Sequence, residues 1–333
     1  RSRIGGVRRV SRTVRGILDA RRPPWELIDP FSKELVRVLT PILERSRYDV
    51  LLAVNEAVEV TSILGRRGVL PPRVVVDWID APSLLYERRI KALPPTRAWI
   101  ARFRTERLIA WQRRVNAVAD AAIYIAEVDR AHARAADNPR VHVIPNGVLP
   151  RDPGLERRDT GTPTIGFLGN MGYRPNVHAA IRLHDKIFGP LAARRPDLRL
   201  KIIGRNPDES LRRLASPRVE ITGEVESIWP HLAEVDIVVF PMEFGGGLQN
   251  KVLESAEAGC AVVVSHMGAA GIGADGMGAL IIEDSDEGMV QAVSALLDDP
   301  PALRAAQKRA AQIRGLFDWK DILPRYASVV LGS

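Results

Sequence analysis

The sequence predicts an α/β protein built from two doubly wound, Rossmann-like domains. Short β-branched runs alternate with segments of helical spacing from about Tyr48 onward, and most of these runs are continuously apolar. Such runs are typical of parallel strands that are covered on both faces, and their alternation with helices is typical of βαβ units. The tract 146–163 is rich in Gly, Pro and charge and lacks periodicity, so it is predicted to be an interdomain linker.

Ten strands are expected, four before the linker tract and six after it. The first four span 49–54, 73–79, 121–126 and 141–145, and the others span 164–169, 200–204, 219–222, 236–241, 261–265 and 279–284. Helical spacing with few breakers predicts helices between them, including 176–195 and 249–258.

The first half has fewer strands than the second. Residues 1–47 are predicted to form helices around Trp25 without an opening strand, so the first domain is atypical or lacks its first strand–helix units. The chain begins at Arg1 rather than at a methionine, which favours a truncated N-terminal domain. We expect domains at 1–155 and 156–315, followed by a helix, 316–333, that packs on its own domain or crosses back to the first.

Composition and charge narrow the class of protein. With 333 residues, 46% hydrophobic and 26% charged, the chain suits a soluble globular protein with two cores. A single cysteine, Cys260, excludes an intrachain disulfide framework and makes a reducing cytoplasm the default location. The net charge of +8 is compatible with nucleic acid, an anionic membrane or merely an Arg-rich composition, but no nucleic-acid motif is present.

One basic segment, 97–114, carries Trp99, Phe103 and Trp111 among arginines. A basic amphipathic helix of this kind can lie on an anionic bilayer. The favoured interpretation is a helix with one buried face and one solvated basic face.

Three consecutive glycines, Gly245, Gly246 and Gly247, separate an apolar strand from a predicted helix. The unpaired N–H groups and the positive dipole end of a helix N-terminus attract anions, and glycines let a phosphate approach the backbone. Lys251 in the first turn is unfavourable to the helix itself, so a bound anion would explain it, and Glu254 can accept hydrogen bonds from a ribose. The position at the carboxyl end of a parallel strand favours this over a glycine turn with a solvated Lys and Glu.

A second glycine-containing turn, "FLGNMGYRPN", follows the first strand of the second half. Gly169 and Gly172 free the backbone, and Arg174 or Asn176 could reach a phosphate. The pattern is not a GxGxxG fingerprint, and a tight turn into the next helix is equally compatible with it.

Other strand ends carry further candidates. Gly204 and Arg205 end the next strand, at the same carboxyl-end edge of the predicted sheet as the two glycine turns. A lone arginine at such a position is more often a surface charge than a ligand. "SHMGAAGIG" supplies another glycine loop. In the first half, Asp80 is a stronger candidate than Asp77 for a base or for orienting an acceptor hydroxyl, and the alternative is that one of them caps the next helix.

Metal and triad chemistry are not indicated. The six histidines are scattered, no cluster has metal-ligand spacing, and there is no Ser–His–Asp arrangement or Walker lysine. Phosphate charge is therefore expected to be neutralised by protein groups, with no metal.

Taken together, several segments resemble family 4 glycosyltransferases of the GT-B class, in particular bacterial sugar transferases of polysaccharide clusters. The resemblance lies in "VHVIPNGV", "TIGFLGNMGYRPN", "LKIIGRNP", "VEITGEV", "GGGLQNKVLESAEAG", "AVVVSHMGAAGI" and "FDWKDI". It implies two Rossmann-like domains that face a cleft. It also implies a hexosyltransferase that moves a sugar from a nucleotide diphosphate-sugar to an acceptor hydroxyl, with retention and usually without a metal, in exopolysaccharide or cell-envelope glycan synthesis.

The resemblance assigns roles by position. Glu254 matches the glutamate that holds the donor ribose, and Arg205 is a second phosphate cation beside Lys251. The implied donor-binding residues are Gly169, Asn170, Arg174, Gly204, Gly245, Gly246, Gly247, Leu248, Lys251 and Glu254. The implied catalytic residues are Asp80, Lys251 and Arg205.

Three departures from the family pattern bear on these roles. The partner glutamate usually found eight residues before Glu254 is Gly246, the usual arginine after the first glycine of the donor domain is Asn170, and a usual His-Asp pair is Ile79-Asp80. These departures keep open a nucleotide-sugar-binding pseudo-transferase without turnover. A nucleotide-sugar 2-epimerase, which shares the two-domain fold, is a further alternative.

The resemblance implies no cofactor beyond a nucleotide-sugar co-substrate, UDP- or GDP-linked, and a saccharide or lipid-linked acceptor. No nucleic acid is expected as a partner. The expected location is cytoplasmic, and peripheral contact with an anionic membrane at the inner face of the plasma membrane stays open.

Overall fold

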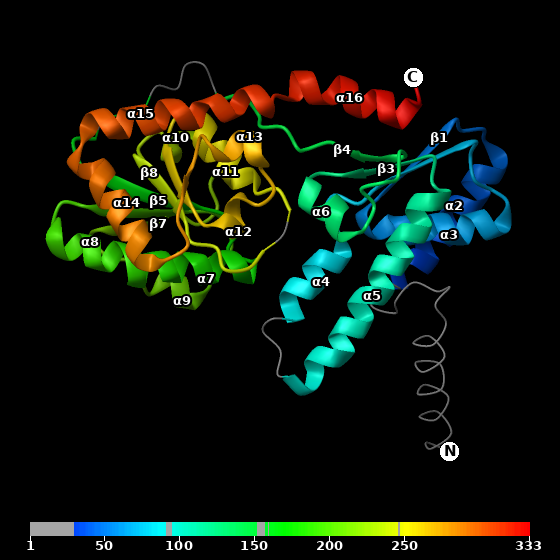
Figure 1. Cartoon of the computed structure of the whole chain (residues 1–333), viewed down its shortest axis with the longest axis horizontal. Helices are drawn as coiled ribbons and strands as arrows, with labels where there is room; N and C mark the ends of the chain where they lie inside the picture. Colours follow the sequence, from blue (N-terminus) through cyan, green and yellow to red (C-terminus); the bar gives the residue numbers. More distant parts are fainter. Residues whose placement is uncertain (1–29, 91–94, 152–156, 159, 246) are drawn as a thin grey trace. The chain divides into compact units, whose positions relative to one another are not determined.

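The structure, a computed structural model, describes residues 30–90, 95–151, 157–158, 160–245 and 247–333 (Figure 1). They form two compact units: unit 1 holds the described residues up to Pro145 together with Leu323–Ser333, and unit 2 holds those of Asn146–Ile322. The expected helices around Trp25 and the candidate Gly246 lie outside the described residues. Within the described ranges, no helix is long and apolar enough to cross a bilayer.

Unit 1 contains a parallel sheet whose order, β1-β2-β3-β4, follows the chain. Its strands are β1 (Val50–Val54), β2 (Arg73–Asp77), β3 (Ala121–Tyr124) and β4 (Val141–Val143). Its helices are α2 (Pro30–Arg45), α3 (Val58–Arg67), α4 (Pro82–Ile90), α5 (Pro95–Val118), α6 (Glu127–His132) and most of α16 (Trp319–Leu331). β3 is buried at every position, as its continuous apolar run predicts.

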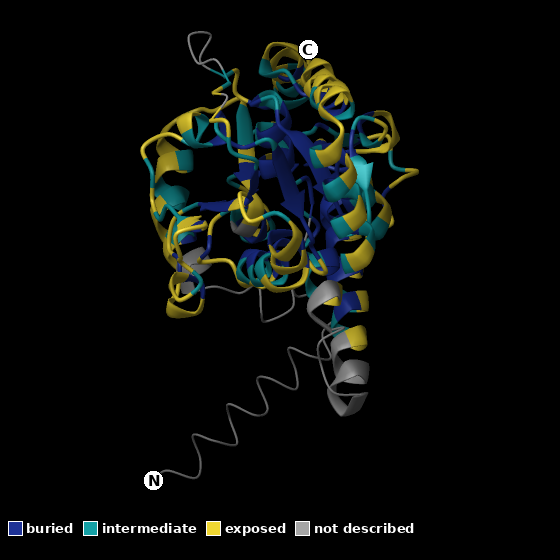
Figure 2. Ribbon diagram, turned by 90° about the vertical axis from the view of Figure 1, so that its left-hand side faces the viewer, coloured by how far each residue is buried: buried dark blue, intermediate teal, exposed yellow. Residues whose placement is uncertain are grey.

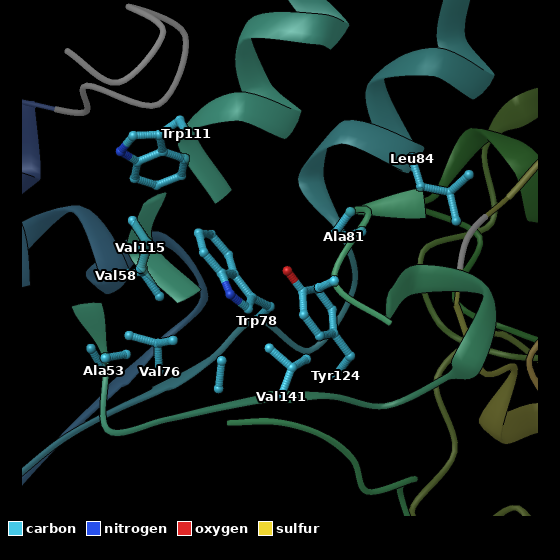
Figure 3. Packing of buried hydrophobic residues seen from close by; sticks show 14 residues of the cluster. Ala53, Val58, Val76, Trp78, Ala81, Leu84, Trp111, Val115, Tyr124 and Val141 are labelled. Carbon is cyan, nitrogen blue, oxygen red and sulfur yellow. The ribbon is translucent and has the colours of Figure 1, made fainter. Parts of the chain in front are cut away.

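Three aromatic side chains, Trp78, Trp111 and Tyr124, lie at the centre of the unit 1 core (Figure 3). The ring centroids of Trp78 and Trp111 lie 5.2 Å apart in an edge-to-face arrangement. The ring centroids of Trp78 and Tyr124 lie 6.3 Å apart, and these two rings are stacked. Two amides of α5 satisfy the polar atoms of this cluster. Asn116 accepts from the Trp78 indole at 2.8 Å and donates to the Tyr124 hydroxyl at 3.1 Å, and Gln112 donates to that hydroxyl at 3.2 Å. One face of the C-terminal half of α5 is therefore part of the core, while Arg113 and Arg114 on the same half are exposed.

Unit 2 contains a six-stranded parallel sheet in the order β10-β9-β8-β5-β6-β7. Its strands are β5 (Thr164–Leu168), β6 (Arg199–Ile203), β7 (Val219–Ile221), β8 (Ile237–Phe240), β9 (Ala261–Val264) and β10 (Ile281–Ile282). Its helices are α7 (Arg174–Arg182), α8 (Gly189–Arg194), α9 (Glu209–Arg212), α10 (Trp229–Leu232), α11 (Asn250–Glu257), α12 (His266–Ala269), α13 (Ala274–Met277), α14 (Asp286–Asp298) and α15 (Pro300–Ala311). The central strands β5, β8 and β9 are buried at every position, whereas the outer strands β6 and β7 each have one exposed residue, Arg199 and Glu220. Dark blue strands surrounded by helices with exposed residues are visible in Figure 2. The ten expected strands are present, and the predicted α/β class with two Rossmann-like units is confirmed.

The strand order of unit 2 reverses between β5 and β8. From β5 the chain proceeds outward through β6 to β7, and then returns to β8 on the other side of β5. In open parallel sheets, ligands bind beyond the carboxyl ends of the strands at such a reversal, because the loops diverge there. The loops after β5 and β8 are the two glycine-containing turns that the sequence indicates.

Candidate functional site

The turn after β8 has a backbone that glycine adopts most readily. Gly245 has a φ of 150° and Gly247 a φ of 55°, and both residues are buried, as is Leu248. Helix α11 begins at Asn250, directly after the turn, and has no acidic residue in its first turn. The unpaired N–H groups and the positive dipole end of α11 therefore favour an anion at this position.

The loop after β9 packs directly on this glycine turn. A Cβ at Gly271 would lie 2.5 Å from the Gly247 carbonyl oxygen and 2.5 Å from the Leu248 Cα. At the start of the same loop, the Ser265 hydroxyl donates to the Met242 carbonyl at 2.7 Å and so ties the loop to the end of β8. The sequence indicated a glycine loop here, and the structure shows that it supports the turn.

Lys251, the second residue of α11, is buried at 8% exposure. Its Nζ donates to Asn176 Oδ1 at 2.5 Å and lies 3.5 Å from Met242 Sδ. It also lies 5.4 Å from the ring centroid of Phe167 and 5.6 Å from that of Phe240. Among the residues that the structure describes, no carboxylate lies within ion-pair distance of this ammonium group, so its direct contacts are a neutral amide oxygen, a sulfur and two ring faces.

Burial controls the electrostatics of Lys251 and Glu254, which lie three residues apart on α11. Loss of hydration lowers the pKa of Lys251 to about 7, and the Glu254 carboxylate opposes this change. Loss of hydration also raises the pKa of Glu254, and Lys251 opposes that in turn. The alternative of a solvated lysine is therefore wrong. A buried amine beside a glycine turn is instead a candidate for binding an anionic oxygen.

The loops after β5 and β6 touch through glycines. Gly204 has a φ of 148°, and a Cβ there would lie 1.8 Å from the Gly169 carbonyl oxygen. The Met171 N–H donates to the Arg205 carbonyl at 2.9 Å. Only glycine at position 204 lets these two strand ends meet so closely.

Two predicted phosphate cations, Arg174 and Arg205, are exposed. Arg174 begins α7, and Arg205 follows β6, next to the loop that carries the exposed Asn170. Within the described ranges, no hydrogen bond or ion pair joins either arginine to Lys251 or Glu254, so their roles stay predictions. In the same ranges, no group of three or more His, Cys, Asp or Glu side chains is arranged to hold a metal ion.

The unit 1 candidates lie in an unusual turn after β2. Ile79 has a φ of 59°, in the left-handed region that β-branched residues rarely adopt. Asp77 accepts from the Ile79 N–H at 3.0 Å and from the Tyr326 hydroxyl of α16 at 2.7 Å. Asp77 thus has a structural role, while Asp80 is half-buried in the same turn and its proposed role stays a prediction.

The candidate site of unit 2 lies in a segment that matches a known protein family. Residues 162–299, which contain the turns after β5, β6 and β8, match the family described as Glycosyl transferases group 1. Over 190 residues the chain is 29% identical to a phosphatidyl-myo-inositol mannosyltransferase of Mycolicibacterium smegmatis, covering 54% of this chain and 48% of that protein. The chain therefore spans about half the length of this curated relative.

Solved structures share the fold over most of the chain. A sucrose-phosphate synthase from Thermosynechococcus elongatus has a TM-score of 0.70 at 14% identity, covering 89% of this chain and 76% of that one. Anabaena HepE in complex with UDP has a TM-score of 0.66 at 16% identity, covering 94% and 85%. The two Rossmann-like units expected from the resemblance to GT-B glycosyltransferases are thereby confirmed.

Proposed function

We propose that the chain is a glycosyltransferase that binds a nucleotide diphosphate-sugar in unit 2. The observation that carries the proposal is the buried Lys251, with no carboxylate in ion-pair range among the described residues, at the start of α11 and directly after the glycine turn. This turn lies at the reversal of the strand order, where ligands bind in parallel sheets. The family match over 162–299 and the shared fold with a UDP-bound protein support it.

In this proposal the diphosphate of the donor lies against the glycine turn. As the sugar leaves, negative charge grows on the diphosphate, and fixed N–H groups with a nearby ammonium stabilise that charge more in the transition state than in the ground state. Lys251 supplies the buried charge, and the solvent-exposed Arg174 and Arg205 are proposed as additional cations for the phosphates. Glu254 accepts hydrogen bonds from the ribose.

The finer features of the proposal rest on the sequence resemblance. They are a UDP- or GDP-linked hexose, retention at the anomeric carbon, no metal or other cofactor, and an acceptor hydroxyl oriented by Asp80. The product would be an exopolysaccharide or another cell-envelope glycan, made in the cytoplasm. NMR of the first-formed product would establish the configuration at the anomeric carbon.

A lipid-linked acceptor would bring unit 1 to the inner face of the plasma membrane. On α5, Phe103 is 49% exposed, and Arg102, Arg113 and Arg114 are also exposed. Flotation with liposomes is expected to depend on anionic lipid, and to weaken when Arg113 and Arg114 are both changed to Glu. Equal flotation with neutral and anionic liposomes would remove the membrane from the proposal.

The donor site is tested by a thermal-shift screen across UDP-, GDP-, ADP- and dTDP-sugars, followed by calorimetry with the best ligand. Lys251→Ala and Glu254→Ala are each expected to weaken donor affinity at least about tenfold, the effect of losing one charge-assisted hydrogen bond. Lys186→Ala, an exposed lysine of the same unit, is the control and should leave affinity unchanged. Unchanged affinity in the first two variants would contradict the site.

Two other outcomes would favour the alternative functions. Donor binding without transfer of the sugar would favour the pseudo-transferase. Formation of an epimerised sugar in the absence of an acceptor would favour the 2-epimerase.

A further inference from the structure

Asn176 connects the two glycine-containing turns of unit 2. It is the third residue of α7 and is 7% exposed. Its Nδ2 donates to the Asn170 carbonyl at 2.9 Å, and its Oδ1 accepts from Lys251 Nζ at 2.5 Å. A Cβ at Gly169 would lie 2.9 Å from the same Nδ2, so the glycine leaves room for this carboxamide. The bond to Asn170 fixes the orientation of the amide, and its oxygen therefore faces the lysine.

The carboxamide oxygen of Asn176 influences the protonation state of the Lys251 amine. An ammonium group has three donors, and in the described part of the chain Asn176 Oδ1 is the oxygen that receives one of them. The sulfur of Met242 and the rings of Phe167 and Phe240 are weaker acceptors without charge. A neutral carboxamide stabilises the protonated amine without cancelling its charge. A carboxylate would cancel it, and an apolar side chain would leave the amine without an oxygen.

We propose that Asn176 is a positioning residue whose fixed carboxamide favours the protonated form of Lys251 and directs its amine, while leaving the charge available to an incoming diphosphate. The identity of the anion rests on the proposed function, whereas the contact itself does not. Glu254, on the same helix, is the charged group that acts on Lys251 in the described part of the chain, and it favours protonation too. Because burial already lowers the pKa of Lys251 to about 7, loss of one hydrogen bond is enough to discharge it at neutral pH.

The first test measures the titration of Lys251 directly, without a ligand. The chain has only seven lysines, so a protein labelled with ¹³C at lysine Cε gives few NMR signals, and loss of one signal in Lys251→Met assigns it. The wild-type midpoint is expected near 7. Asn176→Leu should move it lower by about one to two pH units, and the isosteric Asn176→Asp should move it higher. A midpoint that neither variant moves would overturn the inference, and the aspartate variant decides the matter if the leucine variant fails to fold.

The second test measures the affinity of UDP, GDP and inorganic pyrophosphate between pH 5.5 and 9, at about constant ionic strength. If the ammonium form binds the anion, wild-type affinity should fall about tenfold per pH unit above 7. In Asn176→Leu the fall should begin at lower pH, and in Asn176→Asp affinity should be at least about tenfold weaker at every pH. A purely structural role would lower affinity without moving the pH at which it falls.

A double-mutant cycle completes the test. On the Lys251→Met background, Asn176→Leu should change anion affinity no further, since its effect acts through the amine. If none of the three anions binds to the wild type, the proposed function fails and the positioning role with it. If they bind but the pH profile of Asn176→Leu equals that of the wild type, the inference fails and the proposed function stands.

Discussion

Removing the charge of Lys251 is expected to stabilise unit 2 at neutral pH. Burial lowers the pKa of Lys251 in the folded protein from 10.5 to about 7, and the unfolded chain keeps the ordinary value. Between these two pH values the unfolded chain binds the proton and the folded protein does not, so the free energy of unfolding rises with pH across this window. Below about pH 7 both states are protonated, and the folded state then bears the full unfavourable free energy of a buried charge.

The size of the effect follows from the two pKa values. Their difference of about 3.5, at about 1.36 kcal/mol each, sets an upper limit of about 5 kcal/mol. Lys251→Met fills similar space but leaves Asn176 Oδ1 without its donor, which costs about 1–3 kcal/mol. The variant is therefore expected to be more stable by about 2–4 kcal/mol at pH 6 to 7, and the gain should vanish between about pH 8 and pH 10, above which the variant is the less stable protein.

The assay is urea unfolding at pH 6, 7.5 and 9, followed by pulsed hydrogen exchange of β8 and β9 peptides so that the signal reports on unit 2. The matched control is Lys201, which is also buried but contacts Glu234 at 2.5 Å and Glu220 at 3.2 Å. Its hydrogen bond holds the pKa of Glu234 below the usual range. Lys201→Met should therefore destabilise unit 2, by about 1–3 kcal/mol. The reasoning is refuted if Lys251→Met is equally destabilising at pH 7, or if its effect does not depend on pH.

Two further substitutions test the packing around the candidate residues. Gly271→Ala is expected to displace the glycine turn, because its Cβ would lie 2.5 Å from the Gly247 carbonyl oxygen, and to weaken UDP or GDP affinity in calorimetry by at least about tenfold. Gly278→Ala, whose Cβ meets open space, should leave affinity unchanged. Tyr326→Phe removes the hydrogen bond to Asp77 and should lower the free energy of urea unfolding of unit 1 by about 1–2 kcal/mol, and an unchanged value would show that the contact contributes nothing.

The sequence predicted the strands well because parallel strands covered on both faces are continuously apolar. It also located the glycine turn, since glycines and a lysine at a strand end form a local pattern. It could not predict that Lys251 is buried or that Asn176 binds it, because these residues are 75 positions apart and meet only through the placement of β8 beside β5. The sequence offered Arg174 or Asn176 as a residue that could reach a phosphate, whereas the structure shows Asn176 bound to the lysine. The contact of Gly271 with the turn was equally hidden, because it depends on the path of the loop after β9.

The candidate site is where the chain departs from locally favourable choices. A lysine at a helix start and a buried amine without a paired carboxylate each destabilise the ligand-free protein, as is common at functional sites. Lys201, in the same unit, shows that the fold can pair a buried lysine with carboxylates. The unpaired amine of Lys251 therefore has a specific consequence for the whole protein. Raising the pH through 7 should increase the stability of the ligand-free chain and decrease its affinity for a diphosphate, because one deprotonation drives both changes. Two trends of opposite sign that both begin near pH 7, and that Lys251→Met abolishes, would be difficult to obtain from any other group in unit 2.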